Sequence, residues 1–249
     1  MNHCVVALKS IRAGLRSNLV GRGLVGAIRK AYSLRHPRNG NRLGTSILAG
    51  IAALLLLPLP SLAHHPLGGR VPVTFAEGFL SGLGHPVIGL DHLAFVVAVG
   101  LLAAVSAWGI AIPVVFVLAA MVGTGLHLAE VTLPMAELAI AGSVLGFGVL
   151  LALKDRPQSV VVTGLSAIAG LFHGFAYGEA IFGAQTMPLV AYLAGFTVIQ
   201  MAIAIATFWI GRQLTQRTPA VFVQRAGLVI CGIGATFLAT TLLETVLPA

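Results

Sequence analysis

The chain has 249 residues, of which 57% are hydrophobic and only 9% are charged, whereas about a quarter of the residues of a soluble domain are charged. This composition excludes an ordinary soluble domain and predicts a polytopic membrane protein of the all-α class. The two cysteines, Cys4 and Cys231, supply neither a disulfide framework nor a CxxC metal motif.

The formal net charge of +8 belongs to the first part of the chain. Residues 1–63 contain nine Lys and Arg and no acidic residue, while residues 64–249 contain six basic and seven acidic residues, which gives +9 and −1. A basic segment confined to the N-terminus is typical of a leader. We therefore expect no nucleic-acid partner.

The leader has a recognisable end. After Arg42 an apolar run leads to Ser61-Leu62-Ala63, and small residues three and one positions before a bond fit a signal-peptidase site. We expect residues 1–63 to be a basic leader and signal peptide, cleaved before His64. An uncleaved first membrane helix and an organelle transit peptide are the alternatives, but the cleavage site favours bacterial export and the inner (plasma) membrane.

Six apolar runs, each about 20 residues long, follow the leader and predict six transmembrane helices. Their linkers are short, so residues 64–249 should form one helical membrane domain. The runs cover residues 86–105, 108–127, 134–153, 159–179, 188–211 and 223–246.

The basic residues indicate the orientation of these helices. With the mature N-terminus in the periplasm, five of the six basic residues after the leader fall in or beside cytoplasmic linkers, as the positive-inside rule requires, and only Arg70 lies outside. The same topology places the C-terminus in the periplasm. The five expected inner residues are Lys154, Arg156, Arg212, Arg217 and Arg225.

On this topology every histidine after the leader lies in the outer half of the domain, and five acidic residues accompany them. A charged Asp in the middle of a bilayer costs about 2.5–3.5 kcal/mol, so ionisable groups inside membrane helices indicate a functional site. The histidines are His64, His65, His85, His92, His127 and His173. The acids are Glu77, Asp91, Glu130, Glu137 and Glu179.

The stretch "HPVIGLDH", residues 85–92, carries the densest polar group. In a continuous helix His85 and His92 are two turns apart and share a face, and Asp91 lies next to it. Pro86 suits the first turn of such a helix. Imidazole with carboxylate suits divalent ions such as Ni²⁺, Co²⁺ and Zn²⁺, and Asp91 could instead orient an imidazole.

A second motif, "GLFHGFAYGEAIFGA" at residues 170–184, places His173 and Glu179 among four glycines. Such glycine density allows close backbone approach or local unwinding of a membrane helix. Glycines of the third and sixth runs should also let helices approach closely. These are Gly142, Gly146, Gly148, Gly232 and Gly234.

Each candidate also has a simpler interpretation. His85 could be an interfacial helix-end residue, and Asp91 with His92 a structural polar pair between helices. His127 could be a solvated loop residue, and Tyr177 part of an interfacial aromatic belt. His64 could be an incidental mature N-terminus. The functional interpretation rests on the convergence of these residues on one side of the membrane.

Together these motifs resemble the hydrogenase/urease accessory nickel permeases, the HupE/UreJ family. "HPVIGLDH" matches the H-x5-D-H signature of that family, "LFHGFAYGE" resembles its F-H-G-x-A-H-G-x-E signature, and "LAHHPLGG" resembles its cleaved leader followed by an exposed histidine. Two positions depart from the pattern: Tyr177 stands where the family has a second histidine, and Glu179 comes one position early.

The resemblance implies a six-helix permease that imports nickel, with cobalt second, to supply the maturation of a metalloenzyme such as hydrogenase or urease. It implies His85, Asp91, His92, His173 and Glu179 as the residues needed for transport. His64, His65 and His127 would collect the ion outside. We expect no enzymatic activity and no prosthetic group. The expected partners are the divalent ion and the lipid bilayer, and a homo-oligomer is left open.

Two other functions stay open at this point. The chain could be a non-transporting membrane protein that binds metal as an accessory or assembly factor. It could also be a metal-dependent intramembrane enzyme, although the sequence contains neither HExxH nor GxSxG. An ATP-binding G-x-x-x-x-G-K-[ST] motif is also missing from the sequence, so a transporter would use an ion gradient, the membrane potential or a partner ATPase.

Overall fold

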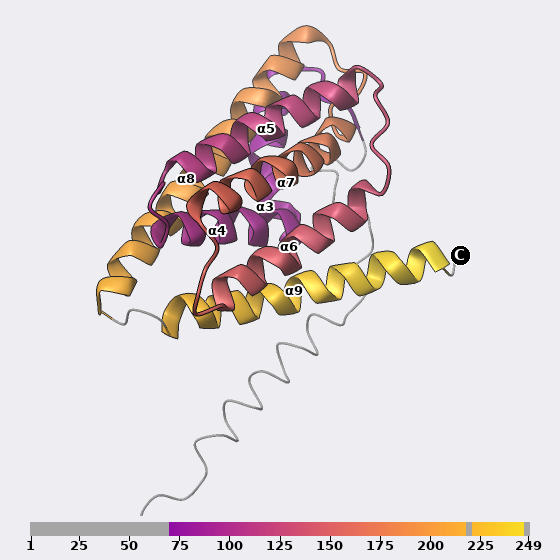
Figure 1. The fold of residues 1–249 in the computed structure, drawn as a ribbon. Helices are drawn as coiled ribbons and strands as arrows, with labels where there is room; N and C mark the ends of the chain where they lie inside the picture. The colour runs from indigo at the N-terminus through magenta and orange to yellow at the C-terminus, as the bar shows by residue number, and fades with distance from the viewer. Residues whose placement is uncertain (1–69, 218–220, 247–249) are drawn as a thin grey trace, which may run out of the picture. The chain divides into compact units, whose positions relative to one another are not determined.

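A computed structural model of the chain describes residues 70–217 and 221–246. The expected cleavage after Ala63 and the two histidines that follow it, His64 and His65, lie outside these residues. The described residues form α-helices and connecting turns with no strand, which confirms the all-α class. Figure 1 shows the helices α3 (Phe75–Ile88), α4 (Leu90–Ala104), α5 (Ala111–Leu128), α6 (Ala136–Ala152), α7 (Ser159–Glu179), α8 (Thr186–Arg217) and α9 (Val221–Val246).

The first predicted span is bent rather than continuous. It begins earlier than expected, at Phe75, where Thr74 and Glu77 form a reciprocal capping box. The chain then breaks at Gly89, and α3 meets α4 at 79°. Pro86 lies in the last turn of α3, so its expected place in a first turn was wrong. Proline removes a backbone donor and glycine is a poor helix former, which explains a break between them.

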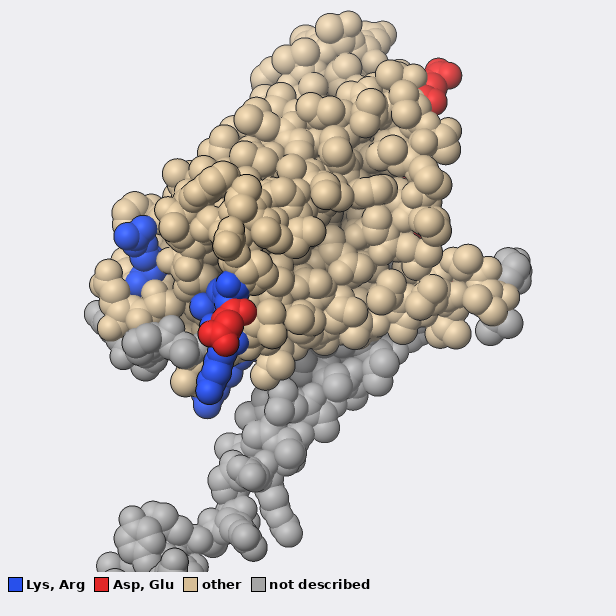
Figure 2. All heavy atoms as spheres, viewed as in Figure 1, with Lys and Arg blue, Asp and Glu red and all other residues tan. Residues whose placement is uncertain are grey.

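Among the helices that the structure describes, four are long and apolar enough to cross a membrane, and the bent pair α3–α4 adds a fifth candidate. The remaining helix, α6, is apolar but only 17 residues long. α7 covers the predicted residues 159–179, and α8 is longer than its predicted 188–211 because no glycine or proline stops the helix after Gly211. In Figure 2 the visible Lys and Arg side chains gather at one end of the molecule, and a broad uncharged band separates them from an acidic group at the other.

Two pairs of helices pack side by side in the same direction. Gly174 lies against Ala120 and Gly178 lies against His127, so α7 and α5 run parallel to each other. Their direct backbone contact fulfils the close approach that the glycine-rich second motif predicts. The other outcome weighed for this motif, local unwinding, does not occur, because α7 is an unbroken helix of 21 residues.

The bent span pairs with α8 in the same manner. Gly78 lies against the backbone of Pro188, and Gly82 lies against the backbone of Tyr192. Further along, Gly100 in α4 lies against Ala204 and Thr207. One long helix therefore accompanies both halves of the bent span and crosses its break.

The third pair, α6 and α9, is antiparallel, since Gly148 lies against Cys231 while Gly234 lies against Leu145. Figure 1 shows α9 running along α6. The expected close approach is confirmed at Gly148 and Gly234. It is wrong at Gly142, Gly146 and Gly232, where an added Cβ would meet nothing within 4 Å, because these glycines lie off the contact face.

Candidate metal centre

The break at Gly89 gathers the expected polar residues inside the protein. His85 ends α3, Asp91 and His92 begin α4, and His173 lies on α7. Their side chains are almost inaccessible, with exposed fractions of 2%, 6%, 1% and 0% respectively. The centroids of the His85 and His92 imidazole rings lie 5.7 Å apart. The expected proximity of these two histidines is therefore found, but through the bend and not through one face of a continuous helix.

A chain of hydrogen bonds orients His92. Its Nδ1 lies 2.9 Å from Nδ1 of His173, and Nε2 of His173 lies 3.0 Å from the hydroxyl of Ser143. The Ser143 hydroxyl already donates to the carbonyl of Ile140, at 2.7 Å. Because a hydroxyl has one proton to give, His173 must donate from Nε2 and accept at Nδ1. Neutral His92 then carries its proton on Nδ1 and a lone pair on Nε2.

His85 reaches the same tautomer by another route. Its Nδ1 lies 3.0 Å from the hydroxyl of Tyr192, which donates to the backbone carbonyl of Tyr177 at 2.9 Å. The Tyr192 oxygen must therefore accept a hydrogen bond from His85 Nδ1. Neutral His85 is left with a lone pair on Nε2.

In each of the two neighbouring imidazoles, Nδ1 is therefore held by a second residue. Metal-binding histidines are usually arranged in this way, with the outer hydrogen bond fixing the tautomer and the ring orientation. The structure thus fixes the ring orientation and the tautomer of both His92 and His85 through a second residue.

Tyr177 completes the cluster from α7. Its ring centroid lies 5.0 Å from that of His85 and 4.6 Å from that of His92. The side chain is fully buried, and its hydroxyl has no hydrogen-bond partner among the residues that the structure describes. A buried hydroxyl without a partner is destabilising, so the Tyr177 phenol beside the two imidazoles indicates a site for a polar ligand.

Asp91 is stabilised by its place in the broken span. It lies in the first turn of α4, where Gly89 is the N-cap. The free backbone N–H groups and the positive end of the helix dipole favour a carboxylate at this position. The break therefore explains how a membrane segment accommodates a buried acid.

Apolar rings from α4 and α5 pack against His173. Phe95 stacks on the His173 ring at 4.3 Å, and Phe116 meets that ring edge-on at 6.2 Å. Water is excluded from His173, and the low local dielectric strengthens each hydrogen bond of the chain.

Two expected site residues lie elsewhere. Glu179 is exposed at the end of α7, and half-buried His127 packs on α5 against Phe175 and Phe182. Within residues 70–217 and 221–246, no three His, Cys, Asp or Glu side chains are placed to hold one ion together. The cluster as it stands offers two imidazoles and a phenol.

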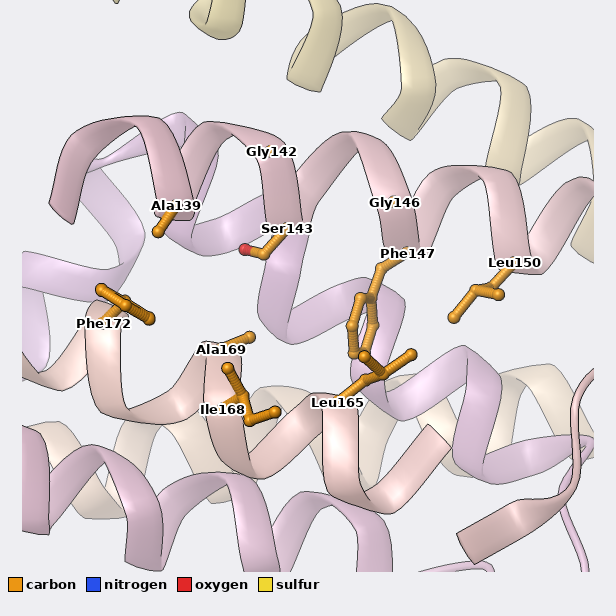
Figure 3. A pocket seen from close by; sticks show the side chains of 10 residues that line it. All are labelled: Ala139, Gly142, Ser143, Gly146, Phe147, Leu150, Leu165, Ile168, Ala169 and Phe172. Atoms are coloured by element: carbon orange, nitrogen blue, oxygen red, sulfur yellow. The ribbon is translucent and has the colours of Figure 1, made fainter. Parts of the chain in front are cut away.

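A cavity of about 300 Å³ lies next to the cluster, between α6 and α7. Figure 3 shows its lining, which is apolar except for Ser143, and apolar side chains such as Phe147 and Leu165 project into it. A divalent ion gains nothing from such walls. The cavity reaches the outer end of the His92–His173–Ser143 chain and is not itself an ion site.

Sequence reasoning missed Tyr192 and Ser143, which fix the two tautomers. Tyr192 is one of only three tyrosines in the chain and lies in an otherwise apolar run, which was an available signal. Ser143 lies in a glycine-rich run that fits helix packing equally well, and only the contact across to α7 distinguishes its role.

Comparisons with known proteins show which family the chain resembles. The family described as HupE / UreJ protein matches residues 52–237. "Protein HupE" from Rhizobium leguminosarum bv. viciae is 34% identical over 189 residues, which cover 71% of this chain and 94% of that protein. No solved structure matches the chain significantly.

Proposed function

This chain belongs to the HupE/UreJ protein family, and on that premise we propose that it is a membrane permease that imports a divalent transition metal ion. Nickel is the first candidate and cobalt the second. The imported ion would supply the maturation of a metalloenzyme such as hydrogenase or urease.

The observation that carries this proposal is the shared tautomer of His85 and His92. Both rings are buried at the break of a bent span, and each has its Nδ1 held by a second residue. Imidazole nitrogens suit Ni²⁺ and Co²⁺. Asp91, buried beside them, supplies the negative charge that offsets a divalent cation.

His173 has a supporting role in this arrangement, because both of its ring nitrogens are engaged. It would join the ligands of the ion only after giving up one of these hydrogen bonds. A transport site has to release its cargo, so ligands that exchange partners suit it better than a closed tetrahedral cage.

The remaining expected residues would act before the ion enters the cluster. His64, His127 and Glu179 would collect it at the periplasmic side, together with His65. This assignment supposes six crossings with both termini of the mature chain in the periplasm. The parallel pairing of α5 with α7, and the antiparallel pairing of α6 with α9, have the directions that six alternating crossings require.

The membrane potential favours inward movement of the ion. A divalent cation gains about 4.6 kcal/mol in crossing 100 mV, from about 2.3 kcal/mol for each charge. This gain is enough to drive accumulation without ATP.

Uptake of labelled metal by cells tests the proposal. Cells that express the chain should accumulate Ni²⁺ or Co²⁺ faster than cells with an empty vector. Metal bound to isolated membranes without accumulation in cells would contradict the proposal and indicate an accessory protein.

A further inference from the structure

A buried amide lies on the face of α8 that packs against the bent span. Residues at four-residue spacing form this face, and each is at most 7% exposed. They are Tyr192, Phe196, Gln200, Ala204 and Phe208. Gln200 is completely buried and is the only member of the row with an amide side chain.

Neither end of this amide is satisfied by the protein. Among the described residues, both Oε1 and Nε2 of Gln200 lack a hydrogen-bond partner, and so does the hydroxyl of Thr197 one turn earlier. Leaving a buried polar group without a partner costs about 1–3 kcal/mol. Gln200 presents two such groups, so the site should bind a polar group that the described residues do not supply.

The packing register places Gln200 at the break of the span. Gly82 of α3 lies against Tyr192 and Phe196, and Gly100 of α4 lies against Ala204. Gln200 falls between these contacts, so the segment beside it contains Gly89, Asp91 and His92.

We propose that Gln200, with Thr197, binds the water ligands of the divalent cation as it passes the break. This inference deepens the proposed function and rests on it. A metal-bound water is a strong hydrogen-bond donor, and the amide oxygen of Gln200 would accept this hydrogen bond. The amide N–H of Gln200 and the hydroxyl of Thr197 would donate hydrogen bonds to a water oxygen. A neutral amide holds such an ion without trapping it, which transport requires.

Reconstituted protein tests the role of Gln200. Labelled Ni²⁺ uptake into vesicles is compared for wild type, Gln200→Met and the control Thr207→Val, whose hydroxyl is bonded within its own helix. We expect Gln200→Met to lower uptake at low Ni²⁺ about tenfold or more, as loss of an outer-sphere group does. Its Tm should stay equal or rise, because an unsatisfied group has been removed, and the control should transport normally.

The possible results separate the two proposals. An active wild type with unchanged uptake in Gln200→Met overturns the role of Gln200 alone. An inactive wild type overturns the proposed function and this inference with it. Should Gln200→Met not insert, Gln200→Asn keeps an amide but withdraws it by one methylene, and normal uptake in that variant overturns the inference equally.

A second inference comes from independent observations, two short sequence similarities between the first and second halves of the helical domain. Residues 89–92 (GLDH) and 170–173 (GLFH) share G-L-x-H. Residues 141–148 (AGSVLGFG) and 226–234 (AGLVICGIG) share A-G-x-V and a closing G-x-G, with one extra residue in the second. The first likeness relates α4 to α7, and the second relates α6 to α9.

Helix pairing follows the same relation. Under this relation α4 corresponds to α7, α5 to α8 and α6 to α9. The parallel pair of α4 with α8 then corresponds to the parallel pair of α7 with α5. It maps the antiparallel pair α6–α9 onto itself, and the contact of Gly148 with Cys231 then corresponds to that of Gly234 with Leu145. His92 and His173 also meet through the same atom, as residues on a two-fold axis do.

We infer that the two halves are inverted repeats related by a pseudo-two-fold axis that passes between His92 and His173. The symmetry is incomplete, since the first span is bent at Gly89 while α7 is unbroken at the corresponding Gly170, and the contact of α4 with α6 also lacks an equivalent. Phe95 of α4 lies 4.5 Å from Phe147 of α6, ring to ring, whereas α7 and α9 hardly touch. The residues that correspond to these two rings are Ala176 and Ile233. The state open to the opposite side should exchange the contacts and bring Ala176 to Ile233.

Cross-linking tests this exchange in protein whose native cysteines are replaced by alanine. Ala176→Cys with Ile233→Cys should react with a short bis-thiol reagent during Ni²⁺ transport, and the cross-linked protein should stop transporting. Phe95→Cys with Phe147→Cys serves as the positive control. A control pair that reacts beside a test pair that never does, under transport or at rest, overturns the inference.

Discussion

His92 and His173 face each other through the same atom, with their Nδ1 nitrogens 2.9 Å apart. The hydrogen bond between these two atoms links the start of α4 to α7. Because His173 donates its single ring proton from Nε2 to the Ser143 hydroxyl, its Nδ1 accepts the hydrogen bond from Nδ1 of His92. A hydrogen bond between two helices thus fixes the tautomer of the His92 imidazole that the proposed function assigns to the ion.

His173→Ala should weaken Ni²⁺ binding to the purified protein by about 10–100-fold, the usual effect of losing the group that orients a metal-binding imidazole. Calorimetric titration with Ni²⁺ measures the affinity. Thr163→Val, on the same helix, is the control, because its hydroxyl is bonded only to the carbonyl of Ser159. Equal affinities for the His173→Ala variant and the wild type would refute the orienting role.

Gly89→Ala should impair transport more than folding. An added Cβ at this position would lie 2.7 Å from Cδ2 of His92 and 3.1 Å from Oδ1 of Asp91. Both neighbours are side chains, so they would shift out of place while the helices stay packed. Ni²⁺ uptake should fall with little change in Tm. Gly164→Ala, which meets nothing within 4 Å, should leave both quantities unchanged.

Gly174→Ala should lower the stability of the fold, unlike Gly89→Ala. Its Cβ would collide with the backbone of Ala120, which cannot move aside without separating α5 from α7. Overpacking of this kind costs about 1–3 kcal/mol. Thermal unfolding in detergent should show a lower Tm, whereas Gly142→Ala, with open space around it, should not. Equal Tm values for the two variants would contradict the close packing of α5 on α7.

Much of the fold was accessible from the sequence, because long apolar runs report membrane helices directly. The range 159–179 for α7 is an example. The bend at Gly89 was not predicted, although Pro86 and Gly89 both lie in the quoted motif. Either residue alone is tolerated in a membrane helix, so the motif by itself does not distinguish a bent span from a continuous one.

The candidate site, like the fold, was only partly predictable from the sequence. Rare ionisable groups in an apolar sequence marked His85, Asp91, His92 and His173, and the structure buries all four. Glu179 was grouped with them through the second motif and its resemblance to the family signature, but it ends α7 and is exposed. The tautomers could not be predicted, since they depend on Tyr192 and Ser143, which come from other helices.

Tyr177→His should change the choice between nickel and cobalt. The substitution replaces a phenol with an imidazole beside His85 and His92, so the number of nitrogen donors rises. Competitive uptake of Ni²⁺ against Co²⁺ measures the preference, with Tyr177→Phe as the control that keeps the ring and loses the hydroxyl. If neither variant alters the ratio, Tyr177 does not contribute to selection.

The central claim is that the bent span and α7 together carry a divalent ion across the membrane. Its most direct measurement is accumulation of labelled Ni²⁺ in vesicles that contain only the purified protein, with the interior held negative. Wild-type protein should accumulate the ion, and the variant with both Asp91→Ala and His92→Ala should not, although it inserts equally. Accumulation at the wild-type rate by that double variant would contradict the account.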